Sequence, residues 1–425
     1  MNRFGSTTLL LSLLAAAAPA TAEVVAITGA KVHTLGSAGT LENATVLIED
    51  GRIRAVGAGL AVPSGARRID AAGKVVTPGL LDSTSQLGLV EVNAVEGTRD
   101  AVVRDDRVTA AFDVVDALNP DSALIAVNRV DGLTRAVVAP GSGESLISGQ
   151  GALIHLGEGP DLVVRAPIAM FAVLGETGQR LAGGSRAAAL LRLREALHDA
   201  KDYAAHRAAY ESGERREYAL SRLDLEALQP VVEGKLPLVV EVHRASDIRA
   251  VLRLAEEFRL KLILSGATEA WKVAPEIVAA KVPVLIDPME NLPDSFEDLG
   301  ATLENAARLH RAGVTFAIQS RDAHNARNVR QAAGNAVAYG LPWEQALRAL
   351  TTVPARIWGI AERYGTLEAG KDADLVVWDG DPLEVTSAAE HVFIRGREIP
   401  QDNRHLRLRD RYRNLGDGQP LGYRP

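Results

Sequence analysis

The chain has 425 residues, of which 47% are hydrophobic, 24% are charged and 4% are aromatic, and its formal net charge is -7. This is the composition of an ordinary folded protein, long enough for one large domain and one small one. The acidic balance and the lack of a basic block argue against nucleic acid or an anionic membrane surface as a partner. The absence of cysteine excludes disulfides and thiolate metal sites.

The first 22 residues have the pattern of a secretion signal. Arg3 supplies the positive start, residues 9–18 form an apolar run too short to cross a bilayer, and 20–22 is a small-x-small cleavage site. The sequence therefore predicts a signal peptide over 1–22, cleaved after Ala22. We expect a periplasmic or secreted protein with no membrane attachment after cleavage. An uncleaved membrane anchor is the alternative interpretation of this segment.

Residues 23–76 predict a small β unit. The β-rich runs 44–49 and 52–56 flank Asp50-Gly51. Asp-Gly between two such runs is a strong hairpin signal, because both turn residues must adopt a positive φ. A further strand over 66–76 leads into a Pro-Gly turn.

From residue 236 onward, strand-like and helix-like patterns alternate. Residues 236–242 form an apolar strand of the kind that is buried on both faces. The helix that follows keeps its apolar residues at helical spacing up to Phe258. Further strands are expected at 261–264, 282–286 and 313–318. Such βα units in series predict a parallel sheet, whereas residues 91–233 are less regular.

Two motifs flank this region. VVTPGLLD occupies 75–82, and GTLEAGKDADLVVWDGDPLE occupies 365–384. The first resembles the signature that opens the barrel of the amidohydrolase superfamily, in particular its imidazolonepropionase-like branch. The second resembles the segment by which these proteins return to a β-sandwich after the barrel. The resemblance implies an α/β fold with a (β/α)8 TIM barrel over 77–365, a composite β-sandwich built from 23–76 and 366–400, and a C-terminal tail over 401–425.

The resemblance also implies a divalent metal, zinc or another, held by two His after the first strand, by His after the fifth and sixth strands, and by an Asp after the eighth. In this chain the first-strand positions are Thr84 and Gln86, the sixth-strand position is Gly266, and the eighth-strand position is Arg321. None of these residue types is a good zinc ligand. We therefore expect no metal and no other cofactor.

The fifth-strand segment keeps two candidate residues. Glu241 takes the family's ligand position and His243 follows it. We predict that Arg321 replaces the charge of the metal, because a guanidinium can neutralise carboxylates such as Glu241 and Asp82. In the family the residue at position 82 mainly fixes the end of the strand, and we keep that interpretation here.

The last strand allows a second register. A slip by one residue would place Asp322, rather than Arg321, at the family's Asp position, and His324 lies on the same polar loop. His243 could then act as a general base with Glu241 and Asp322, because the pKa of histidine is near neutral.

Two functional hypotheses follow. The resemblance implies hydrolysis of C–N bonds other than peptide bonds, in small amides or cyclic amides. In the first hypothesis this exported chain has lost or altered metal chemistry and is a pseudo-enzyme that binds a small molecule or a partner, which would be a second copy or a related amidohydrolase subunit. In the second it is an active hydrolase with an atypical site built from Glu241, His243 and Asp322 or His324.

Overall fold

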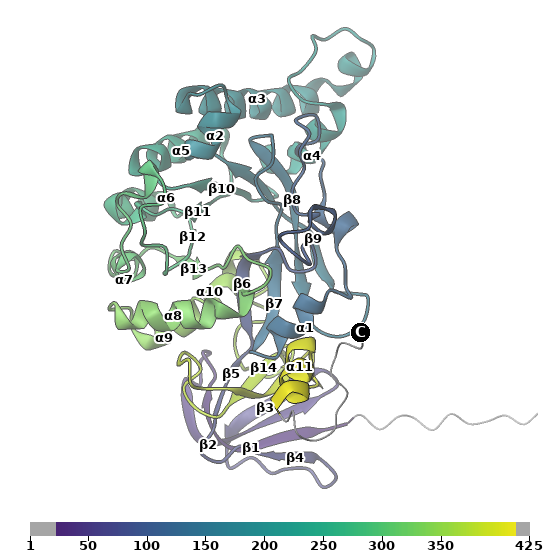
Figure 1. Cartoon of the computed structure of the whole chain (residues 1–425), viewed down its shortest axis with the longest axis vertical. Coiled ribbons are helices and arrows are strands. Elements are labelled where there is room, and N and C mark those ends of the chain that lie inside the picture. The colour runs from purple at the N-terminus through teal and green to yellow at the C-terminus, as the bar shows by residue number, and fades with distance from the viewer. Residues whose placement is uncertain (1–22, 414–425) are drawn as a thin grey trace, which may run out of the picture.

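The computed structural model describes residues 23–413, which form a barrel with a separate sheet at one end (Figure 1). The predicted signal peptide over 1–22 and the end of the tail, 414–425, lie outside the described residues. Among the described residues, no helix is long and apolar enough to cross a membrane.

The separate sheet combines strands from the two ends of the chain. Its eight strands follow the order β16-β15-β14-β5-β1-β2-β3, with β4 paired to β1. The strands are β1 (Val25–His33), β2 (Thr40–Glu49), β3 (Arg52–Ala58), β4 (Arg67–Asp70), β5 (Val75–Pro78), β14 (Leu375–Trp378), β15 (Ala389–Ile394) and β16 (Arg397–Glu398). The predicted hairpin lies between β2 and β3, where Asp50 and Gly51 both have a positive φ. The apolar core of this eight-stranded sheet includes Ile27, Ile48 and Phe393.

The barrel is a second eight-stranded sheet that is nearly closed. Its strands are β6 (Leu80–Ser85), β7 (Leu133–Val138), β8 (Ile147–His155), β9 (Val163–Val173), β10 (Leu238–Val242), β11 (Leu262–Gly266), β12 (Val284–Ile286) and β13 (Phe316–Ile318). The predicted α/β barrel is confirmed, with one local difference. β8 runs antiparallel to β7 and β9, because the connections 139–146 and 156–162 are too short for the crossover that parallel strands need.

Most of the helices cover the outside of the barrel (Figure 1). The helices are α1 (Ala123–Arg129), α2 (Gly175–Leu181), α3 (Arg186–Glu211), α4 (Arg222–Val232), α5 (Ala245–Phe258), α6 (Ala274–Ala280), α7 (Asn305–Arg311), α8 (Val329–Ala338), α9 (Trp343–Arg348), α10 (Thr352–Ile357) and α11 (Arg404–Arg413). α10 differs from the outer helices, because its Ala355 packs in one apolar cluster with the strand residues Val137 and Val239. α5 shows the predicted spacing, since Ile248, Val251 and Phe258 are all buried against the barrel. The tail beyond residue 400 therefore contains a helix, α11.

A buried ion pair connects the barrel to the composite sheet. Arg135 on β7 donates to Asp372 at 2.9 Å and to Asp374 at 2.8 Å. Asp374 also accepts the backbone N–H of Arg395 at 2.7 Å. Both aspartates belong to the 365–384 motif, so this motif holds the returning chain against the barrel. A buried pair of this kind is costly to break, because removing one partner leaves an uncompensated charge.

Asp82 bridges the two ends of the barrel sheet, β6 and β13. Its carboxylate is fully buried and accepts the backbone N–H groups of Ser320 at 2.9 Å and Thr84 at 3.2 Å, as well as the hydroxyl of Ser320. Nearby, the N–H of Arg321 donates to the carbonyl of Thr84 at 2.8 Å. Burial raises the pKa of Asp82 to about 7, because desolvation disfavours the charged form.

We predict that Asp82→Asn flattens the dependence of stability on pH. The pKa of Asp82 is higher in the folded than in the unfolded state, so its stabilising contribution is complete below about pH 4 and is lost as the pH rises to about 7. The loss amounts to at most about 4 kcal/mol. An asparagine amide can accept the two N–H groups and donate to Ser320, as the protonated acid does, but it does not titrate. Urea unfolding at pH 5 and pH 8 measures the difference.

The exposed variant Asp106→Asn is the matched control and should keep the pH dependence of the wild type. An equal pH dependence in wild type and Asp82→Asn would contradict the assignment.

Candidate functional site

A cavity of about 430 Å³ opens at the carboxyl ends of the barrel strands, where the working residues of such barrels are found. Its wall is mostly polar, and its apolar part includes Phe171, Ala172 and Val239. The polar side chains that line it are Thr84, Ser85, Gln86, Ser142, Ser148, Glu241, Ser265, Ser320 and Arg321.

An ion pair lies in the wall of this cavity. Arg321, in the left-handed region at φ 54°, follows β13 and donates to Glu241 at 2.9 Å and to Glu290 at 3.4 Å. Burial disfavours the guanidinium charge, but the surrounding carboxylates outweigh it and raise the pKa of Arg321. Burial likewise opposes ionisation of Glu241, but His243 and Arg321 outweigh it, so the pKa of Glu241 lies below its usual value. The pair is therefore charged at neutral pH.

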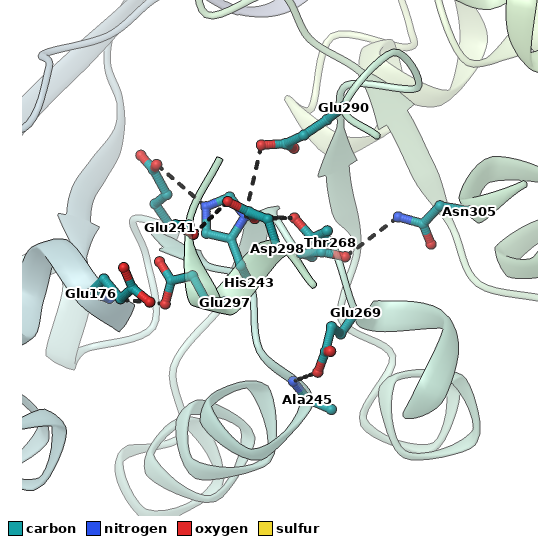
Figure 2. Close-up of polar contacts among 12 residues, drawn as sticks. Glu176, Glu241, His243, Ala245, Thr268, Glu269, Glu290, Glu297, Asp298 and Asn305 are labelled. Carbon is teal, nitrogen blue, oxygen red and sulfur yellow. Dashed lines mark hydrogen bonds and ion pairs between the residues drawn. The ribbon is translucent and has the colours of Figure 1, made fainter. Parts of the chain in front are cut away.

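His243 lies beside this pair and faces three acidic groups (Figure 2). Its Nε2 is 3.6 Å from Glu241, and its Nδ1 is 3.3 Å from Asp298 and 2.7 Å from the hydroxyl of Thr268. Burial lowers the pKa of the imidazole, but contacts with Glu241 and Glu290 outweigh this effect and raise the pKa above its usual value. His243 is thus a hydrogen-bond donor held in a fixed orientation.

Gly266 makes room for the His243 ring. A Cβ at position 266 would lie 2.5 Å from Cε1 of His243, and the residue has a φ of +75°. The ring therefore lies across the space that a side chain would fill at the family's sixth-strand ligand position.

We predict that Gly266→Ala displaces the His243 ring. The added methyl group collides with the ring, and alanine is strained at this φ. We expect a stability loss of about 1–3 kcal/mol and a changed imidazole signal of His243 in a ¹H–¹⁵N NMR spectrum. Gly313→Ala, at a φ of +82° with open space around it, is the control for backbone strain alone. A His243 signal unchanged in Gly266→Ala would argue against this packing.

The loop between β12 and α7, residues 287–304, contributes acidic groups that the sequence analysis missed. Glu290 reaches Arg321, and Asp298 accepts the hydroxyls of Thr268 at 3.1 Å and Ser295 at 2.6 Å. Burial raises the pKa of both Asp287 and Glu290. Asp287 could have been found from its place directly after the seventh barrel strand, whereas Glu290 and Asp298 lie further into the loop.

The structure brings Glu241, His243 and Arg321 together and places Thr84 and Gln86 in the same cavity wall. It does not bring Asp322 or His324 to the site. The carboxylate of Asp322 accepts the backbone N–H of His324 at 2.9 Å, which shapes the loop, and neither side chain lines the cavity. Arg321, rather than Asp322, is therefore the residue of this loop that faces Glu241.

The family's metal does not fit the residues at the family's positions. Thr84, Gln86 and Gly266 offer no imidazole or carboxylate, and zinc prefers such donors. The guanidinium of Arg321 already lies against Glu241, the one carboxylate at these positions. These residues therefore do not make up a ligand set for zinc.

An α/β barrel with polar side chains gathered at the carboxyl ends of its strands is the arrangement found in barrel enzymes. The model of the amidohydrolase family matches residues 193–399. A crystal structure of an amidohydrolase from Thermotoga maritima MSB8 is similar at a TM-score of 0.81 and 29% identity, covering 89% of this chain and 100% of that one.

Two curated proteins are also similar to this chain. The amidohydrolase tasK of Hapsidospora irregularis is 27% identical over 79% of this chain, and the chain spans only 37% of that protein's length. The imidazolonepropionase of Brucella anthropi is 25% identical over 82% of this chain and 91% of its own length.

The chain belongs to the amidohydrolase superfamily and is imidazolonepropionase-like. Membership of this superfamily supports a hydrolase activity on C–N bonds.

Proposed function

We propose that this chain binds a small amide or cyclic amide in the barrel cavity, with the charge of Arg321 in place of the family's metal. The observation that carries this proposal is the 2.9 Å contact between Arg321 and Glu241 in the cavity wall. A guanidinium presents fixed N–H donors, and Glu241 is an acceptor beside it. Together they complement the C=O and N–H groups of an amide.

The cavity supports this class of ligand in size and polarity. At about 430 Å³ it lies in the range of small-molecule sites. Hydroxyl groups of Ser142, Ser148 and Ser265 offer further hydrogen bonds, and Phe171 and Val239 offer apolar contact. The similar protein from Brucella anthropi is named imidazolonepropionase, and an imidazolone is a cyclic amide of this kind.

We predict that Arg321→Gln weakens ligand binding by at least about tenfold, because a charge-assisted hydrogen bond contributes about 1.5–3 kcal/mol. The probes are dihydroorotate and hydantoin, a charged and a neutral cyclic amide, and calorimetric titration is the measurement. Arg311→Gln, on α7 and outside the cavity, is the control and should bind as the wild type does. Lack of saturable binding by both probes, or equal binding by Arg321→Gln, would contradict the proposal.

Hydrolysis assisted by Glu241 and His243 is a second candidate. It is favoured by the 3.6 Å contact between the two side chains and by the C–N hydrolase activity of the superfamily. Incubation of each bound probe with the chain in the presence of a chelator separates the candidates by product analysis. Turnover that is lost in Glu241→Gln would favour hydrolysis, whereas bound and unchanged probe favours the binding role.

We also propose export, on the pattern of residues 1–22. Expression of the full chain in a bacterium with an outer membrane should yield periplasmic protein that begins at Glu23, as read by N-terminal sequencing. Recovery in the cytoplasm with residues 1–22 retained would overturn this proposal, and retention in the membrane would favour the uncleaved anchor.

A further inference from the structure

We propose that His243, Glu290 and Asp298 form a binding site for a divalent transition-metal ion, displaced from the family's metal position. One donor atom from each residue lies within 4.8 Å of the others. Nδ1 of His243 is 3.3 Å from Asp298 and 4.0 Å from Glu290, and Figure 2 shows both carboxylates directed toward the ring. One imidazole and two carboxylates from separate positions are a donor set that holds Zn²⁺ or Mn²⁺.

The surrounding polar contacts orient these donors. Nε2 of His243 faces Glu241 at 3.6 Å, and a histidine that ligates a metal through one nitrogen commonly donates from the other to a carboxylate. Nδ1 is thereby directed at the cluster. The second oxygen of Asp298 accepts the hydroxyl of Ser295 at 2.6 Å, which fixes that carboxylate. The hydroxyl of Thr268, 2.7 Å from Nδ1, is placed to be a further oxygen donor.

The charges also match a divalent ion. Arg321 contacts Glu241 at 2.9 Å and Glu290 at 3.4 Å. Its one positive charge offsets one of the three carboxylates Glu241, Glu290 and Asp298, which leaves two negative charges beside one imidazole. A divalent ion bound to neutral His243 balances these two charges, and exchange of a proton for the metal is the usual coupling at such sites.

The position of the cluster indicates what the ion does. None of the three residues lines the cavity. His243 follows β10, whereas Glu290 and Asp298 both belong to the 287–304 loop. The loop packs few apolar side chains inward, since Leu292 is 64%, Phe296 83% and Leu299 68% exposed. We therefore assign to the ion the role of holding this loop against β10, beside the cavity, rather than activating water within it.

The test measures metal binding and loop protection. The full chain, purified without a His-tag and treated with a chelator, is titrated with Zn²⁺ and separately with Mn²⁺ in a calorimeter, and bound metal is counted by mass spectrometry. We expect one ion per chain. We also expect slower proteolytic cleavage within 288–300 when the ion is present, which is a readout independent of activity.

Glu290→Gln and Asp298→Asn should each weaken binding of the ion by at least about 100-fold, since even changes outside the ligand shell cost 10–100-fold. Glu304→Gln, on an exposed carboxylate at the end of the same loop, is the control and should bind as the wild type does. Circular dichroism identifies any variant that does not fold, and the partly exposed Glu290 provides the variant least disturbed by substitution.

Binding of less than one ion per chain, or equal binding by the wild type and both folded variants, would overturn the proposal. Loss of ion binding in Asp298→Asn, with binding of the amide probes unchanged, would separate this site from the cavity, so that the amide-binding proposal stands or fails on its own measurement.

Discussion

The hydrogen bonds of Asp82 are the constraint on which the site depends. They join β6 to the end of β13 through Ser320, and the next residue, Arg321, donates its N–H to the carbonyl of Thr84. These contacts between β6 and the residues after β13 thus fix the backbone position of Arg321. From there its side chain extends to Glu241 on β10. Asp82 acts on the site through position and has no contact with Glu241 itself.

The residues at the family's metal positions hold an ion pair and offer no set of metal ligands. A guanidinium carries one positive charge where a divalent ion would carry two, and Arg321 contacts Glu241 at 2.9 Å and, more distantly, Glu290 at 3.4 Å. Glu290 and Asp298 lie on the Nδ1 side of the His243 ring. The cavity wall therefore holds the close pair of Arg321 and Glu241, and the other two carboxylates belong to the cluster beside it.

Most of the fold was predictable from the sequence, because the motifs at 75–82 and 365–384 are local and specific. The structure gives the second of them a physical reason, since its Asp372 and Asp374 bind the buried Arg135. The reversed direction of β8 was not predicted. It depends on the length of two connections in a region where strand and helix patterns are weak. We predicted that the guanidinium of Arg321 would neutralise Glu241 and Asp82. In the structure Arg321 contacts Glu241, whereas Asp82 accepts a hydrogen bond from Ser320.

The candidate site was less predictable, because its acidic loop has no motif and its geometry depends on tertiary contacts. Matching this sequence to the ligand positions of the amidohydrolase family located Glu241, His243 and Arg321, which lie in or shortly after regular strands. Glu290 and Asp298 lie several residues into an irregular loop, and their approach to His243 depends on Thr268 and Ser295.

Gly266 links the loss of the family's ligand to the arrangement that replaces it. An imidazole at this position would occupy the space in which the His243 ring now lies, since even a Cβ would be 2.5 Å from that ring. With glycine, the ring extends over β11 and its Nδ1 reaches Thr268 and Asp298. The glycine that offers no donor to the cavity therefore also leaves room for His243 to direct its Nδ1 toward the loop. The ion pair in the cavity and the cluster beside it both depend on residues at the family's ligand positions. A search for the family's ligands would record these positions only as missing ligands.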